Sequence, residues 1–354
     1  MAKLLCFSAL LATLNFASAA PPGAAPEAIT RPKSYAALGD SFASGLGSGF
    51  PVDDNVLCQR QDGSYPARLV KSGVFRDGLE RFSNQACYGN GMDDLDTQIN
   101  NLGGQKFDLV TLTIGHHDFK LEALPTACVY QIRGPDIPDP QAFCDQALRN
   151  SHREYFYIAR FEILAEKIER ILKEVLNEGG QLFITNYPVP FGVPELEDIC
   201  DTVSFSPHDP ALTMTYANRR FFNSIVHGLN YMIETVVLNF GYNVQLMDFN
   251  KMFEGKRFCE PDRMDPIGAN DPGVFLTDAR TTLKFPDFSP NPEELRFQIN
   301  LDEDTMYDLK QKSVFHPKAA AHRALAQHIA NKLEHMIALE KIRKGKGNGF
   351  GRQN

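Results

Sequence analysis

The sequence lacks an excess of basic residues, an N-glycosylation sequon and, beyond its first twenty residues, any long apolar run. It carries 36 basic and 44 acidic residues, a net charge of −8. Nucleic-acid binding requires a basic face, so we expect no nucleic-acid partner. Without an Asn-x-Ser/Thr site we expect no N-linked glycan. A helix that spans a bilayer needs about 20 apolar residues, so we expect no stable membrane insertion.

The first twenty residues are the exception. Lys3 precedes an apolar run, and small residues occupy positions 17–20, a pattern typical of a signal peptide with its cleavage site. We therefore expect a secreted, extracellular protein. The chain should divide into a signal peptide (1–20), a proline-rich leader (21–32), one domain (33–340) and a disordered basic, glycine-rich tail (341–354).

The cysteine count agrees with secretion. Seven cysteines are present, and Cys6 leaves with the signal peptide. An even number in a secreted chain implies disulfides, and six cysteines allow fifteen pairings. The close pairs and interleaved histidines of a zinc site are missing. We favour pairing between neighbours, because it closes three successive loops without crossing: Cys58–Cys87, Cys128–Cys144 and Cys200–Cys259.

Short apolar runs alternate with helical patterns along the domain. The runs lie at 34–39, 81–86, 107–115, 181–188 and 243–249, and the helical patterns at 64–75, 93–102, 157–180, 212–241 and 318–342. This alternation predicts an α/β fold with a parallel sheet covered by helices on both faces. Residues 123–150 and 255–312 fit neither pattern, and we expect both to be long loops.

Chemically versatile residues follow the predicted strands. In such a sheet, ligands bind at the carboxyl ends of the strands. Ser41 follows the first strand, Gly89 the second and His116-His117 the third, and His316 precedes the last helix. Each alone suits a plain turn or helix start, but together they supply a nucleophile, oxyanion donors and a base. Adjacent histidines rarely bind one ion and no third ligand is suitably spaced, so we expect no metal.

Four segments resemble the conserved blocks of one enzyme family. "ALGDSFASG", "ACYGNG", "TIGHHDF" and "HPKAAAH" are similar to the blocks of SGNH hydrolases, also called the GDSL lipase/esterase family, over about residues 33–335. The cysteine-bearing segments resemble secreted fungal and actinobacterial members most. The resemblance implies a flavodoxin-like, three-layer α/β/α sandwich with a central five-stranded parallel sheet. It also implies carboxylic ester hydrolysis without a metal or organic cofactor.

The resemblance also implies a role for single residues. Ser41 corresponds to the nucleophile, and His316 to the general base. The backbone N–H groups of Ser41 and Gly89 correspond to donors of the oxyanion hole. The implied substrate is an ester of a small molecule, a lipid or an acylated carbohydrate, and the sequence does not choose among these.

The chain departs from the family pattern at two positions. His117 stands where the third block has Asn, and its Nδ1–H either donates to the oxyanion in place of the amide or takes no part. Ser313 stands where the family has the Asp that orients the histidine. The carbonyl of Ser313 is a possible substitute for that Asp, as is Asp308. Two such replacements leave an alternative open: a catalytically impaired binding protein on the same scaffold.

Overall fold

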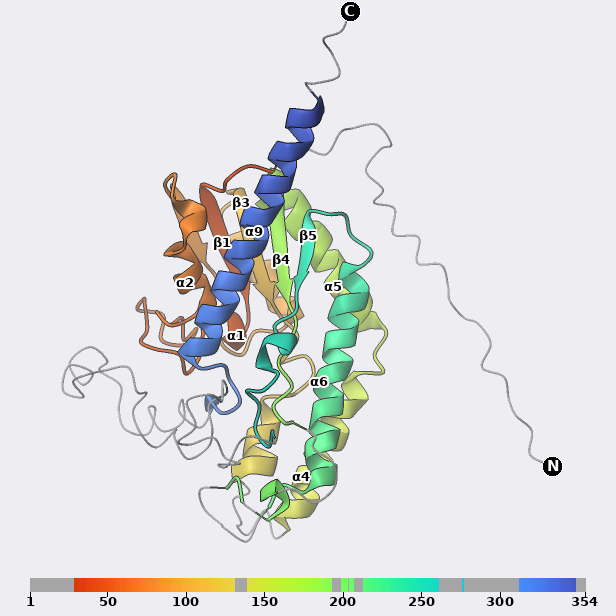
Figure 1. The fold of residues 1–354 in the computed structure, drawn as a ribbon. Coiled ribbons are helices and arrows are strands. Elements are labelled where there is room, and N and C mark those ends of the chain that lie inside the picture. Colours follow the sequence, from red (N-terminus) through yellow and green to blue (C-terminus); the bar gives the residue numbers. More distant parts are fainter. Residues whose placement is uncertain are drawn as a thin grey trace, which may run out of the picture.

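Five parallel strands form the centre of the protein, in the order β2-β1-β3-β4-β5 (Figure 1). The computed structural model describes residues 29–130, 139–192, 199–202, 204–206, 213–260, 276 and 312–347. The strands are β1 (Ser34–Gly39), β2 (Arg81–Asn84), β3 (Phe107–Thr113), β4 (Leu176–Thr185) and β5 (Val244–Met247). All six residues of β1 are buried, as expected for a central strand covered on both faces.

Helices cover the sheet in two layers. They are α1 (Ser41–Ser44), α2 (Tyr65–Val70), α3 (Leu95–Asn101), α4 (Pro140–Glu154), α5 (Ala159–Arg170), α6 (Tyr216–Val237) and α9 (Ala319–Gly347). Single 3-10 or π turns lie at Gly73–Phe75, Met92–Asp94, Pro125–Tyr130, Ile171–Val175, Ile199–Asp201 and Asn250–Phe253. Helices α2 and α9 pack together on one face, and α3, α5 and α6 pack in series on the other. In Figure 1, α9 crosses in front of the sheet. The predicted three-layer sandwich is confirmed.

Helix α4 lies in a segment that we expected to be a loop. Asp139 caps it by accepting the N–H of Ala142 at 3.0 Å, and Pro140 occupies the first turn, where a missing N–H costs nothing. The helical pattern over 157–180 also ends early, because β4 already begins at Leu176 and pairs there with Phe107. Both differences, the presence of α4 and the early end of the helical pattern, occur where the local residues suit a helix end and a turn equally well.

The domain extends beyond both of its expected limits. Residues 29–32 belonged to the expected leader, yet the guanidinium of Arg31 bonds the Glu334 carboxylate, with Nη2 to Oε2 at 3.0 Å, and pairs with Asp77. At the other end, α9 continues to Gly347, because lysine and arginine favour a helix and suit its C-terminal end. The expected signal peptide and residues 348–354 lie outside the described residues, as do 261–275 and 277–311 of the expected second loop.

Three disulfides connect the loops to this framework. The bonded pairs are Cys58–Cys87, Cys128–Cys144 and Cys200–Cys259, which confirms the predicted neighbour pairing. The first joins the segment after α1 to the segment after β2. The second joins α4 to the turn before it. Such bonds are typical of proteins that fold in an oxidising compartment.

Candidate active site

The end of β1 is pressed tightly against β3 at the edge of the sheet where α1 lies (Figure 1). Gly39 has φ = 132°, and a Cβ added there would lie 2.1 Å from the carbonyl oxygen of Thr113, so no larger residue fits. The next N–H, of Asp40, donates to that same carbonyl at 2.9 Å. The chain then leaves the sheet in a sharp turn that begins with Ser41.

The carboxylate of Asp40 holds this turn in shape. Its Oδ1 accepts the N–H of Phe42 at 2.9 Å and caps the short helix α1. Its Oδ2 accepts the hydroxyl of Tyr187, two residues beyond β4. Burial raises the pKa of Asp40 to about 7, while the bonds to Tyr187 and to two main-chain N–H groups oppose that rise.

The hydroxyl of Ser41 lies beside the imidazole of His316. Ser41 Oγ and His316 Nε2 are 2.7 Å apart, although 275 positions separate the two residues in the chain. Both residues are only 4% exposed. His316 sits in the turn just before α9, and Phe315 before it has φ = 63°, a strained value for a residue with a side chain. The fold therefore fixes both residues at the carboxyl ends of the strands.

Backbone carbonyls set the orientation of the His316 ring. Nδ1 lies 3.3 Å from the carbonyl oxygen of Val314, and a carbonyl only accepts, so Nδ1 carries the proton. Nε2 is then the acceptor that faces the Ser41 hydroxyl. The carbonyl of Ser313 accepts the main-chain N–H of His316 at 3.0 Å. The Val314 carbonyl thus lies next to Nδ1, and the expected carbonyl of Ser313 also favours the protonated ring.

The buried His316 is a neutral base at pH 7. Burial lowers its pKa to about 4, and the carbonyls of Val314 and Ser313 oppose this by favouring the charged ring. Phe42 provides part of the apolar surroundings, with its ring centre 4.8 Å from that of the imidazole. A neutral imidazole with a free Nε2 lone pair is the form that can remove a proton from Ser41.

Two main-chain donors remain open beside Ser41. Within the described part of the chain, neither the N–H of Ser41 nor that of Gly89 has a hydrogen-bond acceptor. Gly89 has φ = 79°, and a Cβ added to it would meet no atom within 4 Å. Open N–H groups next to a nucleophile suit a developing oxyanion.

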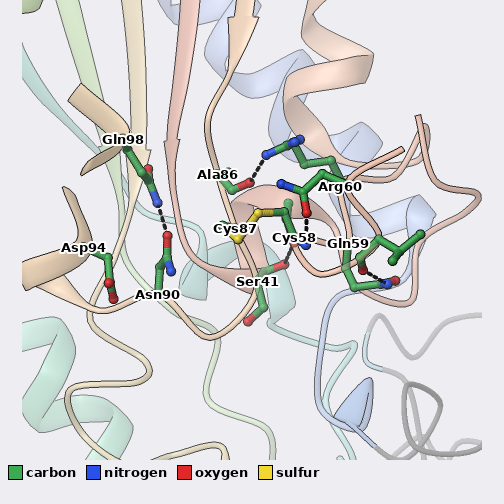
Figure 2. Close-up of a disulfide and its surroundings, with 12 residues drawn as sticks. Ser41, Cys58, Gln59, Arg60, Ala86, Cys87, Asn90, Asp94 and Gln98 are labelled. Atoms are coloured by element: carbon green, nitrogen blue, oxygen red, sulfur yellow. Dashed lines mark hydrogen bonds between the residues drawn. A yellow bond between two sulfur atoms is a disulfide. The ribbon is translucent and has the colours of Figure 1, made fainter. Parts of the chain in front are cut away.

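The segment that carries Gly89 is tied down on both sides. Before it, the disulfide joins Cys87 to Cys58; after it, the side chain of Asn90 accepts from Gln98 Nε2 at 2.7 Å (Figure 2). Figure 2 shows Ser41 next to this disulfide. These two tethers hold the Gly89 segment near the turn of Ser41.

The two adjacent histidines occupy different surroundings. His117 is 49% exposed and its Nδ1 lies 3.6 Å from Glu122 Oε1. Among the described residues no hydrogen bond or ring contact joins its side chain to Ser41 or His316, so its part in an oxyanion hole stays a prediction. The ring of His116 instead lies 5.7 Å from that of His316, centre to centre.

Sequence reasoning missed the cluster of rings around the Ser41–His316 pair. The Phe42 ring lies 5.0 Å from that of His116 and 4.9 Å from that of Tyr187. Tyr187 follows β4 just as Ser41 follows β1, and side chains after parallel strands meet at the same end of a sheet, but this position alone did not distinguish Tyr187 from a core residue.

Neither a metal site nor a membrane-spanning helix is found in the described ranges. No three His, Cys, Asp or Glu side chains there gather as metal ligands would. None of the helices described is both long enough and apolar enough to cross a bilayer.

Comparison with known proteins gives concordant matches. The model of the GDSL-like lipase/acylhydrolase family matches residues 37–324. A curated lipase of Streptomyces rimosus is 32% identical over 124 residues, which are 35% of this chain and 45% of that protein. The aligned part thus spans less than half of the relative's length.

Two solved structures share the fold. The extracellular lipase of Streptomyces rimosus is 19% identical, with a TM-score of 0.58 over 84% of this chain and 99% of that one. Phospholipase A1 of Streptomyces albidoflavus is 17% identical, with a TM-score of 0.57 over 85% and 99% of the two chains. At these identities the likeness concerns the fold.

Proposed function

Since this chain belongs to the GDSL-like lipase/acylhydrolase family, we propose that it hydrolyses carboxylic esters through Ser41, with His316 as general base. The observation that carries the proposal is the 2.7 Å contact between Ser41 Oγ and His316 Nε2. Nε2 is unprotonated and faces the hydroxyl, and the opposite ring nitrogen, Nδ1, donates to the Val314 carbonyl.

The proposed reaction has two halves. As Ser41 Oγ attacks the ester carbonyl carbon, His316 Nε2 takes the hydroxyl proton and then gives it to the departing alcohol, leaving an acyl-serine. A water molecule then attacks the acyl group while His316 takes its proton, and the carboxylic acid leaves as Ser41 regains its hydrogen. The oxyanion of each half would accept from the N–H groups of Ser41 and Gly89, with His117 as a third donor.

The Ser41–His316 pair would work as a dyad. In a triad a carboxylate orients the histidine, and the loss of that group costs about 10⁴-fold in kcat. In this chain the carbonyls of Val314 and Ser313 would replace the carboxylate, since both favour a protonated ring during the reaction. They fix the tautomer fully but stabilise the charge less than an anion does.

The proposed setting is extracellular and the substrate an acyl ester. Residues 1–20 would direct secretion, in keeping with three disulfides and with an extracellular relative. The names of the relatives, a lipase and a phospholipase A1, point to lipid esters as the first substrates to try. Small-molecule esters and acylated carbohydrates remain in the proposed class.

A catalytically impaired binding protein is the other candidate, motivated by His117 and Ser313 at two family positions. A catalytically inactive site would not require an unprotonated histidine oriented toward a serine, nor two main-chain N–H groups without an acceptor. These features favour the hydrolase over the binding protein.

The test compares hydrolysis of p-nitrophenyl acetate and butyrate by the purified protein and by Ser41→Ala. We expect the variant to lose at least about 10³-fold in kcat, since it has no nucleophile. Ser72→Ala is the matched control, because the Ser72 hydroxyl only donates to the carbonyl of Leu69. Equal rates for Ser41→Ala and the control would end the proposal.

A further inference from the structure

The hydroxyl of Tyr187 lies between two segments of the candidate site. It donates to Oδ2 of Asp40, on the turn that carries Ser41. It also accepts the main-chain N–H of His116 at 3.3 Å, on the segment that follows β3. One buried hydroxyl therefore joins the ends of β1 and β3 from a position beyond the end of β4.

Tyr187 itself has little freedom to move. Its N–H donates to Asn230 Oδ1 at 2.8 Å, and its carbonyl accepts from Asn230 Nδ2 at 2.7 Å, so one side chain of α6 holds its backbone from both sides. Its ring packs edge-on against Phe42 and is 1% exposed. A hydroxyl fixed this firmly can set the position of the groups bonded to it.

The groups bonded to the hydroxyl are next in the chain to expected donors of the oxyanion hole. Asp40 holds the N–H of Phe42 and so determines the direction of the Ser41 N–H, one residue earlier. His116 directly precedes His117, the third expected donor. A shift of either segment would move a donor relative to the reacting carbonyl, and small displacements of such donors are costly.

We propose that Tyr187 is a positioning residue. Its hydroxyl bonds hold the Ser41 turn and the His116-His117 segment in a fixed relative position and so set the geometry of the oxyanion hole. The inference rests on the proposed esterase function. It assigns Tyr187 no contact with substrate: the hydroxyl acts through Asp40 and through the main chain of His116.

The hydrogen bond from Tyr187 to Asp40 depends on pH, because it requires Asp40 as an accepting carboxylate. The titratable groups that face Asp40 are Tyr187, Tyr65 of α2 and Asp118 of the segment after β3. Burial raises the pKa of Asp40 to about 7, and the Tyr187 bond lowers it. As the pH falls through about 7, Asp40 takes up a proton and its hydrogen bond with Tyr187 weakens. Removal of the hydroxyl should raise this midpoint further.

The experiment measures kcat and KM of Tyr187→Phe between pH 5 and 9 with a soluble p-nitrophenyl ester, per serine titrated with a fluorophosphonate. We expect kcat at pH 8 to fall about tenfold or more, KM to stay within about twofold, and the acidic midpoint to rise by about one pH unit. Tyr35→Phe is the matched control, since it also removes a buried tyrosine hydroxyl, one that bonds Thr111. It should change neither kcat nor the midpoint.

Asp40→Asn provides a second readout if Tyr187→Phe does not fold. The amide cannot titrate, so the step in kcat near pH 7 should vanish and kcat should stay level down to pH 5, because His316, with a pKa of about 4, remains neutral there. Wild-type kcat and midpoint in Tyr187→Phe, or an unchanged step in Asp40→Asn, would overturn the inference. Full activity in Ser41→Ala would instead defeat the proposed function.

Discussion

At position 117 a histidine replaces the Asn of the family pattern, and the structure gives it a carboxylate neighbour. Nδ1 lies 3.6 Å from Glu122 Oε1, within reach of an ion pair when the ring is protonated. An imidazole donates from Nδ1 at about the place where an Asn amide does, so the two residues can serve one purpose. In the proposed reaction, Glu122 would compete with the oxyanion for that donor.

Two substitutions test this role. We expect His117→Asn to keep or raise kcat, because the amide donor does not depend on a tautomer. His117→Ala should lower kcat at least tenfold, since the loss of one oxyanion donor costs roughly 10²- to 10³-fold. Steady-state kinetics on p-nitrophenyl butyrate measure both. An unchanged rate in His117→Ala would show that the residue takes no part.

Single residues were predictable from the sequence where a motif reaches the end of a strand. Ser41 and Gly89 were predicted in this way and His316 from the motif before the last helix, and Ser41 and His316 lie 2.7 Å apart. Val314 and Tyr187 were not identified. A carbonyl contact depends on backbone torsions that no residue type encodes, and here on the strained Phe315. A tyrosine after a strand is also common enough in a core to carry no signal alone.

At the level of elements, the disulfide Cys58–Cys87 joins the segment after α1 to the segment that carries Gly89, so we expect it to affect both stability and activity. It closes a loop of 29 positions and anchors the Gly89 segment beside Ser41 (Figure 2). The double variant Cys58→Ser/Cys87→Ser should lose about 2–4 kcal/mol of unfolding free energy. It should also lose about tenfold in kcat per titrated serine, because the Gly89 donor is no longer held in place.

The bond Cys128–Cys144 is the matched control for that experiment. It links α4 to the preceding turn, and the two cysteines are 16 positions apart. Its double serine variant should lose comparable stability with kcat unchanged. Urea unfolding and active-site titration separate the two effects. Equal kcat in both double variants would contradict a role for Cys58–Cys87 in the oxyanion hole.

Elements with strong periodicity were predicted, and one helix with weak signals was not. Helices α5 and α6 carry long apolar stripes, so their positions agree with the sequence pattern. In α4 the buried positions include Cys144 and Ser151, which do not read as an apolar stripe. The segment 123–150, which we expected to be a loop, contains Pro140 in the first turn of this helix.

At the scale of the whole molecule, the site depends on distant parts of the chain meeting at one edge of the sheet. The strand order 2-1-3-4-5 brings the ends of β1, β3 and β4 together, and the turn just before α9 places His316 beside Ser41 at these ends. Alternating strands and helices predicted a parallel sheet covered on both faces, but they did not predict the strand order. The extent of the domain was harder to predict, because the bonds of Arg31 to Glu334 are visible only after folding.

The proposed reactivity of Ser41 would therefore be a property of the folded molecule, and covalent labelling measures it most directly. A fluorophosphonate reacts with activated serines and requires no knowledge of the substrate. We predict that the native protein takes up one label on Ser41, found by peptide mapping, that His316→Ala reacts at least about 10²-fold more slowly, and that urea-unfolded protein takes up none. A native protein that stays unlabelled, or reacts equally fast without His316, would contradict the account.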